Sequence, residues 1–274
     1  EKVGGKTSNP PSWGEQPAGK RAGGVPPLPK KVLELYSGTG ALSAAFRKKG
    51  WESRECDIAH GDDLLDPATQ REVLEDIRQR RYGHVHLATP CTTFSIAYYG
   101  PWRKNGCTRS TECPGGAGTV PKEVRGNAHA AFTARAITAC REAGVSWTLE
   151  NPLSSLLWLM PSIAMRVLRQ PVAKIHMCQY GALYLKPTLV VGSADWVPEL
   201  ERCCPRDHAH ERLQQSVSTP EGSRDRTSLA GAYTESFARA IAAGAVKALE
   251  AGRAGAAEDQ ATPGRRVEVS VEGH

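Results

Sequence analysis

The sequence predicts an α/β fold with a mainly parallel sheet and helices on both of its faces. Short apolar segments alternate with segments of helical periodicity from residue 31 to residue 250, an order typical of strand–helix–strand units. Three of the apolar segments also end in residues suited to chemistry: a glycine-rich turn, a cysteine and a carboxylate. Ligands of open α/β sheets bind at the carboxyl ends of the strands, so these features predict an active site at that edge.

The first half of the expected domain contains three strands. An apolar run predicts a strand at 31–36, and apolar residues on one face predict a helix at 40–49. A short strand at 51–56 and a helix at 67–80 are expected next. The apolar run from 84 to 88 then predicts the strand that leads to Cys91.

The second half begins after a long loop at 97–125, which is rich in glycine, proline and charge. A helix at 127–143 is followed by an apolar strand at 145–149 and a helix at 153–169. Strands are expected at 172–177 and 187–192, an irregular polar region at 193–226 and an alanine-rich helix at 227–250. These elements give one domain at 31–250, flanked by a disordered leader at 1–30 and a disordered tail at 251–274.

Composition restricts the class of protein. The chain has 274 residues, enough for one large domain. It has no apolar stretch near the roughly 20 residues of a membrane helix and starts with no signal peptide. We therefore expect an intracellular protein without a membrane partner, nuclear in a eukaryote and otherwise cytoplasmic. Eight irregularly spaced cysteines should be reduced, with Cys56, Cys140 and Cys178 in the core.

Positive charge is concentrated in two segments of this chain, whose net charge is +6. Residues 1–31 carry six Lys/Arg against two Asp/Glu, and residues 97–126 carry five against two. The second segment follows Cys91, so it would place positive charge beside a thiol that acts on a polyanion. Solvated loop charges are an equally good interpretation of this pattern alone.

The turn Ser37-Gly38-Thr39-Gly40 joins the first strand to a helix. Its glycines would let a ligand approach the backbone beside the free N–H groups of the helix start. Because residue 43 is Ser, the turn does not match G-x-G-x-x-G, and a plain tight connection is the alternative. Asp57 ends the second strand, where a carboxylate can bind a ribose diol. Asp63 is expected either to accept a proton from an exocyclic amine of a ligand or only to place a negative charge at the start of the next helix.

Cys91 and Glu150 are the candidate catalytic residues. Cys91 follows Pro90 at a strand end, where a thiol is accessible, and it would need a nearby cation or helix start to become a nucleophilic thiolate. A structural free cysteine is the alternative. Glu150 ends an apolar strand, where burial should raise its pKa so that it can hold a proton near neutral pH.

A metal site is a further candidate, although the spacing is unlike the usual C-x-x-C pairs. We expect no metal as the main interpretation. The candidate ligands in the alternative interpretation are Cys203, Cys204, His208 and His210.

These motifs, in this order, resemble those of the DNA cytosine-5 methyltransferases. The Tyr36–Gly40 turn resembles that family's S-adenosylmethionine loop, Pro90-Cys91 its catalytic motif, and Glu150-Asn151 its Glu-Asn-Val motif. Residues 227–249, with Gly231-Ala232-Tyr233, are similar to its C-terminal motif. The resemblance spans 31–250 and implies a Rossmann-like methyltransferase fold and the cofactor S-adenosylmethionine. The expected cofactor contacts are Tyr36, Ser37, Gly38, Thr39, Gly40, Asp57, Asp63 and Pro90, and the expected substrate contacts are Ser95, Asn151, Gln179 and Lys186.

The resemblance also implies a reaction. Cys91 would add to C6 of cytosine, Glu150 would contact N3 and the exocyclic amine, and C5 would take the methyl group. A base in a duplex would first be flipped out, and segment 97–126 would close over it.

Two departures from the family keep other functions open. No arginine stands after Gln179, where the family has Gln-x-Arg-x-Arg, and residues 192–226 are far shorter than a target-recognition domain. DNA is the expected partner ahead of RNA, with a fused or partner domain supplying specificity. The alternatives are a catalytically inactive methyltransferase-like binding module of a larger or mobile-element protein, and a cysteine hydrolase that uses one of the histidines His129, His176, His208 or His210.

Overall fold

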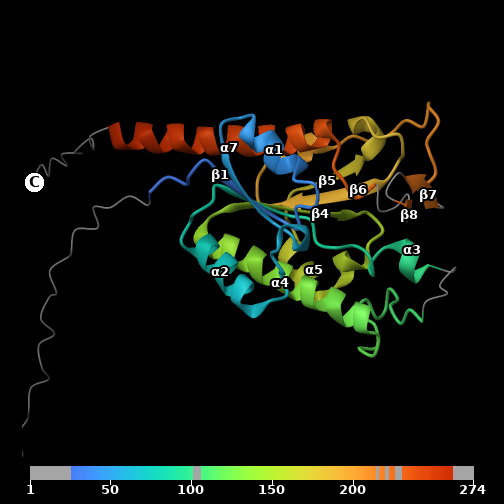
Figure 1. Cartoon of the computed structure of the whole chain (residues 1–274). Coiled ribbons are helices and arrows are strands. Elements are labelled where there is room, and N and C mark those ends of the chain that lie inside the picture. Colours follow the sequence, from blue (N-terminus) through green and yellow to red (C-terminus); the bar gives the residue numbers. More distant parts are fainter. Residues whose placement is uncertain (1–25, 101–105, 214–215, 220–221, 226–229, 262–274) are drawn as a thin grey trace, which may run out of the picture.

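A six-stranded sheet forms the centre of the computed structural model, which describes residues 26–100, 106–213, 216–219, 222–225 and 230–261 (Figure 1). Its strand order is β2-β1-β3-β4-β6-β5. The first four strands in this order are parallel, whereas β6 runs antiparallel to both β4 and β5. The strands are β1 (Lys31–Leu35), β2 (Glu52–Cys56), β3 (His84–Leu87), β4 (Ser146–Pro152), β5 (Val172–His176) and β6 (Pro187–Gly192).

Helices cover both faces of the sheet (Figure 1). One face carries α1 (Ala41–Arg47) and α7 (Glu235–Ala261), and the other carries α2 (Pro67–Arg78), α4 (Pro121–Ala143) and α5 (Pro161–Val167). Each strand contributes side chains to the core on both faces of the sheet, because successive side chains point to opposite faces. Leu33 and Leu35 join the core on the α2/α4 side, and Val32 joins the core on the α1/α7 side. The predicted Rossmann-like α/β class is therefore confirmed.

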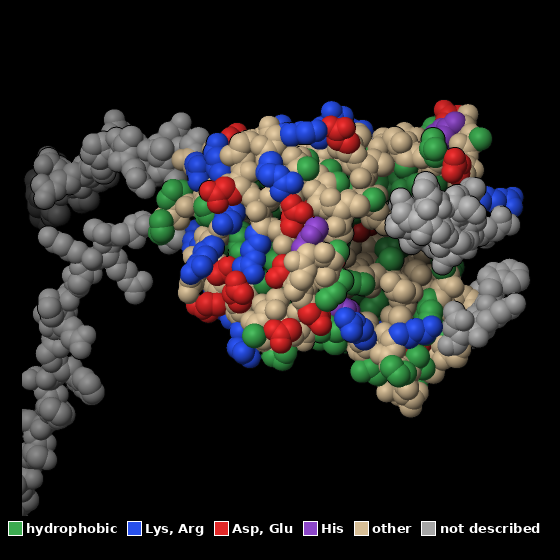
Figure 2. All heavy atoms as spheres, in the orientation of Figure 1, with side chains coloured by type: hydrophobic (Ala, Val, Ile, Leu, Met, Phe, Trp, Pro, Cys, Tyr) green, Lys and Arg blue, Asp and Glu red, His purple; other side chains and the backbone are tan. Residues whose placement is uncertain are grey.

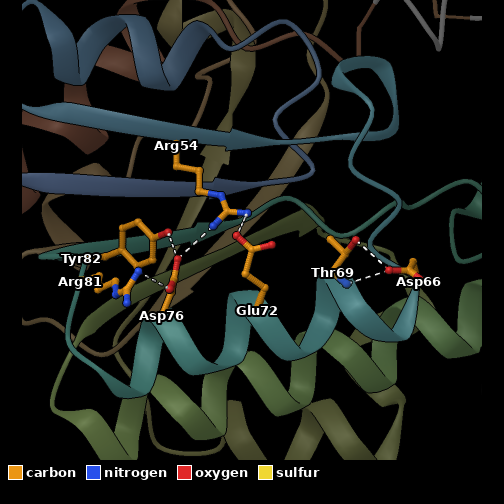
Figure 3. Close-up of polar contacts among 7 residues, drawn as sticks. All are labelled: Arg54, Asp66, Thr69, Glu72, Asp76, Arg81 and Tyr82. Atoms are coloured by element: carbon orange, nitrogen blue, oxygen red, sulfur yellow. Dashed lines mark hydrogen bonds and ion pairs between the residues drawn. The ribbon is translucent and has the colours of Figure 1, made fainter.

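Helix α2 shows how local sequence fixes an element to the sheet (Figure 3). Asp66 caps its start by accepting hydrogen bonds from the N–H and hydroxyl of Thr69, and Pro67 suits the first helical position. Farther along, Asp76 accepts from Arg54 of β2 and from the Tyr82 hydroxyl. These contacts tie α2 to the strand that precedes it.

Several expected boundaries were wrong for identifiable reasons. Helix α4 starts at Pro121, because proline begins it earlier than the apolar periodicity indicated. The single helix expected at 153–169 is a 3₁₀ turn, η2 (Leu156–Leu159), followed by α5, since Pro161 starts a new helix. Helix α7 continues to Ala261, so the tail expected from 251 begins as helix.

The region expected to be irregular at 193–226 contains regular structure. It holds the turn η4 (Val197–Leu200) and an antiparallel hairpin of β7 (Ser216–Thr219) and β8 (Gly222–Asp225). Short helical segments η1 (Ile58–His60), α3 (Ile96–Tyr99) and η3 (Met177–Tyr180) complete the elements. Residues 1–25 of the expected leader and 262–274 of the expected tail lie outside the described residues. Among the residues that the structure describes, none of the helices combines the length and the apolar character needed to cross a bilayer.

Candidate active site

The turn after β1 has a backbone that few residue types tolerate. Tyr36, Gly38 and Gly40 have φ values of 63°, 53° and 67°, in the left-handed region. Asp57, at the end of β2, fixes this turn because its Oδ2 accepts a hydrogen bond of 3.0 Å from Gly38 N, while its Oδ1 accepts one of 2.9 Å from Ala59 N. The carboxylate predicted to hold a ribose thus lies at the glycine turn, where it shapes the backbone.

A cavity of about 480 Å³ lies at the carboxyl ends of β1, β3 and β4. The space-filling view shows a hollow on the side of the molecule where these strands end, with basic side chains beside it (Figure 2). The cavity brings together the glycine turn, Cys91 and Glu150, which are distant in sequence. Its lining residues are Tyr36, Ser37, Gly38, Thr39, Ala41, Ala88, Thr89, Pro90, Cys91, Thr92, Glu150, Asn151, Pro152, Lys186, Gly231, Ala232 and Tyr233.

Cys91 sits four residues beyond the end of β3 and is half-buried. Its carbonyl accepts hydrogen bonds from the N–H groups of Phe94 and Ser95, which hold the following loop in a tight turn. Burial raises the pKa of the Cys91 thiol, and the nearby Glu150 adds to this, whereas Lys186 opposes it. The thiol form is therefore favoured until a positive charge stabilises the thiolate.

Glu150 and Asn151 are held at the end of β4 by a few specific contacts. Asn151 donates a hydrogen bond of 2.7 Å from Nδ2 to the carbonyl of Thr89, which fixes the orientation of its side chain. Burial raises the pKa of Glu150, as the sequence predicted, while Lys186 and a hydrogen bond from Tyr233 partly oppose the rise. Burial thus favours the protonated form of Glu150.

A chain of buried hydrogen bonds leads away from Glu150 beneath helix α7. It runs from Glu150 through Tyr233, His86, Thr148 and His84 to Ser146, with each step between 2.8 and 3.1 Å. Burial lowers the pKa of both histidines to about 3, so both are neutral. One direction of donation then satisfies every group. The Ser146 hydroxyl donates to His84 Nδ1, and His84 Nε2–H donates to the Thr148 hydroxyl, which donates to His86 Nδ1. His86 Nε2–H donates to the Tyr233 hydroxyl, which donates to Glu150.

Lys186 is the cation of the cavity. It directly precedes β6, and its Nζ donates a hydrogen bond of 2.8 Å to the carbonyl of Ala230. This bond also ties the β6 edge to the segment that carries Tyr233. Lys186 lowers the pKa of both Cys91 and Glu150, so within the described residues it is the positive charge that acts on both of these groups.

Five of the residues predicted to bind cofactor or substrate are not among those that line the cavity: Gly40, Asp57, Asp63, Ser95 and Gln179. Asp63 accepts a hydrogen bond from Leu65 N and lies 3.9 Å from Arg125, so it shapes the start of the next segment. Ser95 precedes α3, and Gln179 lies in η3 with its amide near the Cys178 sulfur. Gly40 is part of the turn, but the space beside its Cα is occupied by the Glu55 carboxylate.

One cation of the basic segment after Cys91, Arg109, differs from the expectation. Arg109 is fully buried, and its guanidinium donates to Thr93 Oγ1, to Asn127 Oδ1 and to the Glu123 carbonyl. It also lies 3.9 Å from the centre of the Phe94 ring. Arg109 therefore fastens the Cys91 loop to α4 and presents no charge to a polyanion. Arg103 and Lys104 lie outside the described residues.

The hydrolase alternative required a histidine base beside Cys91. Neither His129 nor His176 lines the cavity, and His208 and His210 lie together at another place. The residues that sequence reasoning missed are His86, Thr148 and the hydroxyl of Tyr233. Polar residues inside apolar strands were the available signal for the first two.

The metal candidate also differs from the expectation. Cys204, His208 and His210 do come together, but their fourth neighbour is Cys178, whereas Cys203 is exposed and points elsewhere. Cys178 is thus half-buried in this cluster, while Cys56 and Cys140 are buried core residues as predicted.

The cavity leaves polar groups unpaired that a polar ligand could bind. Within the described part of the chain, Ser37 Oγ, Glu150 Oε1 and Asn151 Oδ1 are buried without a hydrogen-bond partner, and all three residues line the cavity. Buried oxygens without partners are costly unless a ligand supplies donors.

No protein-family model matches the chain, and no curated protein sequence matches it. Among solved structures it is similar to the methyltransferase EhMeth of Entamoeba histolytica, with 10% identity and a TM-score of 0.38 over 71% of this chain and 59% of that one. The Dnmt2 methyltransferase of S. pombe has 11% identity and a TM-score of 0.36, over 67% of this chain and 58% of that one. A triple mutant of Spodoptera frugiperda DNMT2 has 13% identity and a TM-score of 0.32, over 68% of this chain and 55% of that one. The chain thus spans less than two thirds of each of these proteins, and a likeness at this level carries no argument about activity.

Proposed function

We propose that this protein is an S-adenosylmethionine-dependent methyltransferase that methylates C5 of cytosine through a covalent bond between Cys91 and C6. The observation that carries the proposal is that Cys91, Glu150 and residues Tyr36 to Thr39 of the glycine turn line one cavity. A nucleophile, a proton donor and a backbone turn open to a ligand are the groups that this reaction needs.

The turn is proposed to hold the cofactor. The backbone at Gly38, which lines the cavity, has open space beside it, since a Cβ added there would meet nothing within 4 Å. Ser37 Oγ and Asn151 Oδ1 are the unpaired groups available to bind it. Bound S-adenosylmethionine supplies an electrophilic methyl group, and its positive sulfur favours an anion nearby.

Glu150 is proposed to make cytosine reactive. Its raised pKa keeps a proton on the carboxyl, which can be donated to N3 while the other oxygen accepts from the exocyclic amine. Protonation at N3 withdraws electrons from C6, which is the atom that Cys91 attacks. The Cys91 sulfur then bonds to C6, C5 becomes nucleophilic and takes the methyl group. The cofactor sulfonium, having given up its methyl group, would leave as a neutral thioether. Loss of the C5 proton to water would re-form the C5–C6 double bond and expel the Cys91 thiolate, and the N3 proton would return to Glu150.

Lys186 is proposed to stabilise the Cys91 thiolate. Its positive charge is the larger of the influences that lower the pKa of the thiol, against burial and against Glu150. Without such a cation, a half-buried thiol beside a carboxyl would stay protonated.

The partner is proposed to be DNA ahead of RNA, with the target sequence selected in part by a fused or partner domain. The described residues between β6 and α7 contain only short elements, which is little surface for reading bases in a groove. A flipped base would enter the cavity at a cost of a few kcal/mol.

A trapping experiment tests the proposal. The chain is incubated with S-adenosylmethionine and DNA or RNA that contains 5-fluorocytosine, beside Cys91→Ala and the control Cys203→Ser, whose thiol is exposed elsewhere. We expect a stable protein–nucleic acid adduct with wild type and Cys203→Ser and none with Cys91→Ala. Because C5 then bears fluorine, the final elimination is blocked and the adduct persists.

Three results decide between the alternatives. Methyl transfer to cytosine without any adduct would refute Cys91 as the nucleophile. S-adenosylmethionine binding without transfer to DNA or RNA would identify the inactive binding module. An adduct with RNA and none with DNA would replace DNA as the substrate.

A further inference from the structure

Two cysteines and two histidines meet at one point outside the cavity, where the segment after η4 crosses the end of β5. The ligand atoms of Cys178, Cys204, His208 and His210 all lie within 4.8 Å of one another. None of the four lines the cavity that holds Cys91. We propose that this cluster is a tetrahedral zinc site of Cys2His2 type.

The distances within the cluster match those around a bound zinc ion. The Cys204 sulfur lies 3.5 Å from His210 Nε2 and 3.8 Å from His208 Nε2. Tetrahedral zinc with Zn–S of about 2.3 Å and Zn–N of about 2.0 Å places neighbouring S and N ligands about 3.5 Å apart. The two sulfurs and two ring nitrogens can thus hold zinc with small adjustments.

The surroundings orient the ligands toward the same point. The Asp207 carboxylate lies 2.8 Å from His208 Nδ1, so Nδ1 carries the proton and Nε2 keeps its lone pair toward the Cys204 sulfur. This carboxylate–histidine pair is a common support of zinc ligands. The backbone N–H of Arg206 donates to the Cys204 sulfur over 3.2 Å, a contact that stabilises a thiolate. Arg206 has φ of 63°, which turns the chain so that His208 returns to Cys204.

Zinc is favoured over other divalent ions by the donor set. Two thiolates and two imidazoles in a closed tetrahedron are the donors of structural zinc sites, whereas calcium and magnesium prefer oxygen. Two thiolates also neutralise the charge of the ion, so a half-buried site carries no net charge. All four positions are filled by protein, so the ion would be structural and not catalytic.

The zinc would anchor the segment between η4 and the β7–β8 hairpin. Glu201 and Arg202, at the start of this segment, bond to Lys174 and His176 of β5, and farther along Cys204 N donates to His176 Nδ1 and Glu211 N to Leu183 O. Residues 203–210 contain no helix or strand, and a metal commonly replaces a core in such a segment. The hairpin that follows starts at Ser216.

Metal analysis of the purified full-length chain tests the site. Elemental analysis should give one zinc per chain for the wild type. Cys203→Ser is a matched control, because Cys203 neighbours Cys204 in sequence but is exposed outside the cluster, and it should keep its zinc. Cys178→Ser and His210→Ala should retain less than a tenth of the metal. A zinc content of zero in the wild type after zinc is added and excess is removed would overturn the proposal, as would equal loss in Cys203→Ser.

Cobalt gives a second readout that does not depend on how stable a variant is. After chelation, Co²⁺ alone is added to the wild type, which should show the d–d bands of a tetrahedral ion and a thiolate-to-cobalt charge-transfer band. Removing one sulfur in Cys178→Ser should reduce the charge-transfer intensity by about half per bound ion. An unchanged spectrum would exclude Cys178, and a disulfide between Cys178 and Cys204 in protein purified under reducing conditions would exclude the site.

Discussion

The hydroxyl of Tyr233 donates a hydrogen bond of 3.1 Å to Oε2 of Glu150, so the segment before α7 holds the buried carboxyl at the end of β4. The same hydroxyl lies 2.9 Å from Nε2 of the neutral His86. Tyr233, which lies outside the parallel strands, therefore opposes the rise that burial causes in the pKa of Glu150.

Tyr233→Phe should lower kcat/KM for methyl transfer by up to roughly tenfold, because the neutral Glu150 carboxyl loses the hydrogen bond that orients it. The bond from Tyr233 lowers the pKa of Glu150, so its loss raises that pKa further. Because the reaction uses neutral Glu150, the alkaline limb of the pH–rate profile should move to higher pH. Tyr180→Phe is the control, since its hydroxyl binds the Leu200 carbonyl away from the cavity. Superimposable profiles for Tyr233→Phe and wild type would contradict this role.

Gly38→Ala should weaken S-adenosylmethionine binding by at least about tenfold, because the new methyl group would project from a left-handed turn that lines the cavity. Gly50→Ala is a matched control: Gly50 also has positive φ, and its added Cβ also meets nothing within 4 Å. Both variants should lose about 1 kcal/mol of stability. A difference between their S-adenosylmethionine affinities, measured by titration calorimetry, therefore reports a contact with the ligand and not a loss of stability. Equal affinities would remove Gly38 from the cofactor site.

Arg109→Ala should lower the free energy of unfolding by about 3 kcal/mol, since it leaves buried acceptors on Thr93, Asn127 and Glu123 unpaired. Arg125→Ala removes a more exposed cation 3.9 Å from Asp63 and should change stability by less than about 0.5 kcal/mol. Urea unfolding measures both. Two equal and small changes would mean that Arg109 is not the anchor of the Cys91 loop.

Glu34→Gln should remove a pH dependence of stability. Burial raises the pKa of Glu34 from 4.5 to about 7, so its folded form keeps a proton that the unfolded chain loses. This contribution to stability is fully present below pH 4.5 and is lost as the pH rises through about 7. The stability of the variant relative to wild type should therefore rise by about 2–3 kcal/mol between pH 5 and pH 8.

Denaturant unfolding at both pH values measures this difference. The pKa values of His84 and His86 also change on folding, but both histidines are present in both proteins. Their contribution to the pH dependence of stability is therefore the same in both and drops out of the difference. A difference that stays constant with pH would show that Glu34 is ionised in the folded protein.

The sheet and the main site residues were predictable because their signals are local. An apolar run followed by a polar residue places Cys91 and Glu150 at strand ends, and parallel strands bring such ends to one edge. The signals that failed depend on distant partners. His86 meets Tyr233 across 147 positions of sequence, and Cys178 reaches the Cys204 cluster only through folding. Arg109 looked like a solvated loop charge because the sequence does not reveal which basic residue has buried acceptors.

The reversed direction of β6 decides which end of a strand contributes to the cavity. In the parallel strands, the useful residues lie at or beyond the carboxyl end, as Glu150 near the end of β4 and Cys91 after β3 do. Because β6 is antiparallel to β4, with Thr188 opposite Pro152, its beginning lies at the same edge, and Lys186 arrives there ahead of the strand. A parallel β6 would carry Lys186 to the far edge, near Ser146, and leave Cys91 without its cation. In other chains of this architecture, the counterpart of Lys186 should therefore be sought in front of the reversed strand.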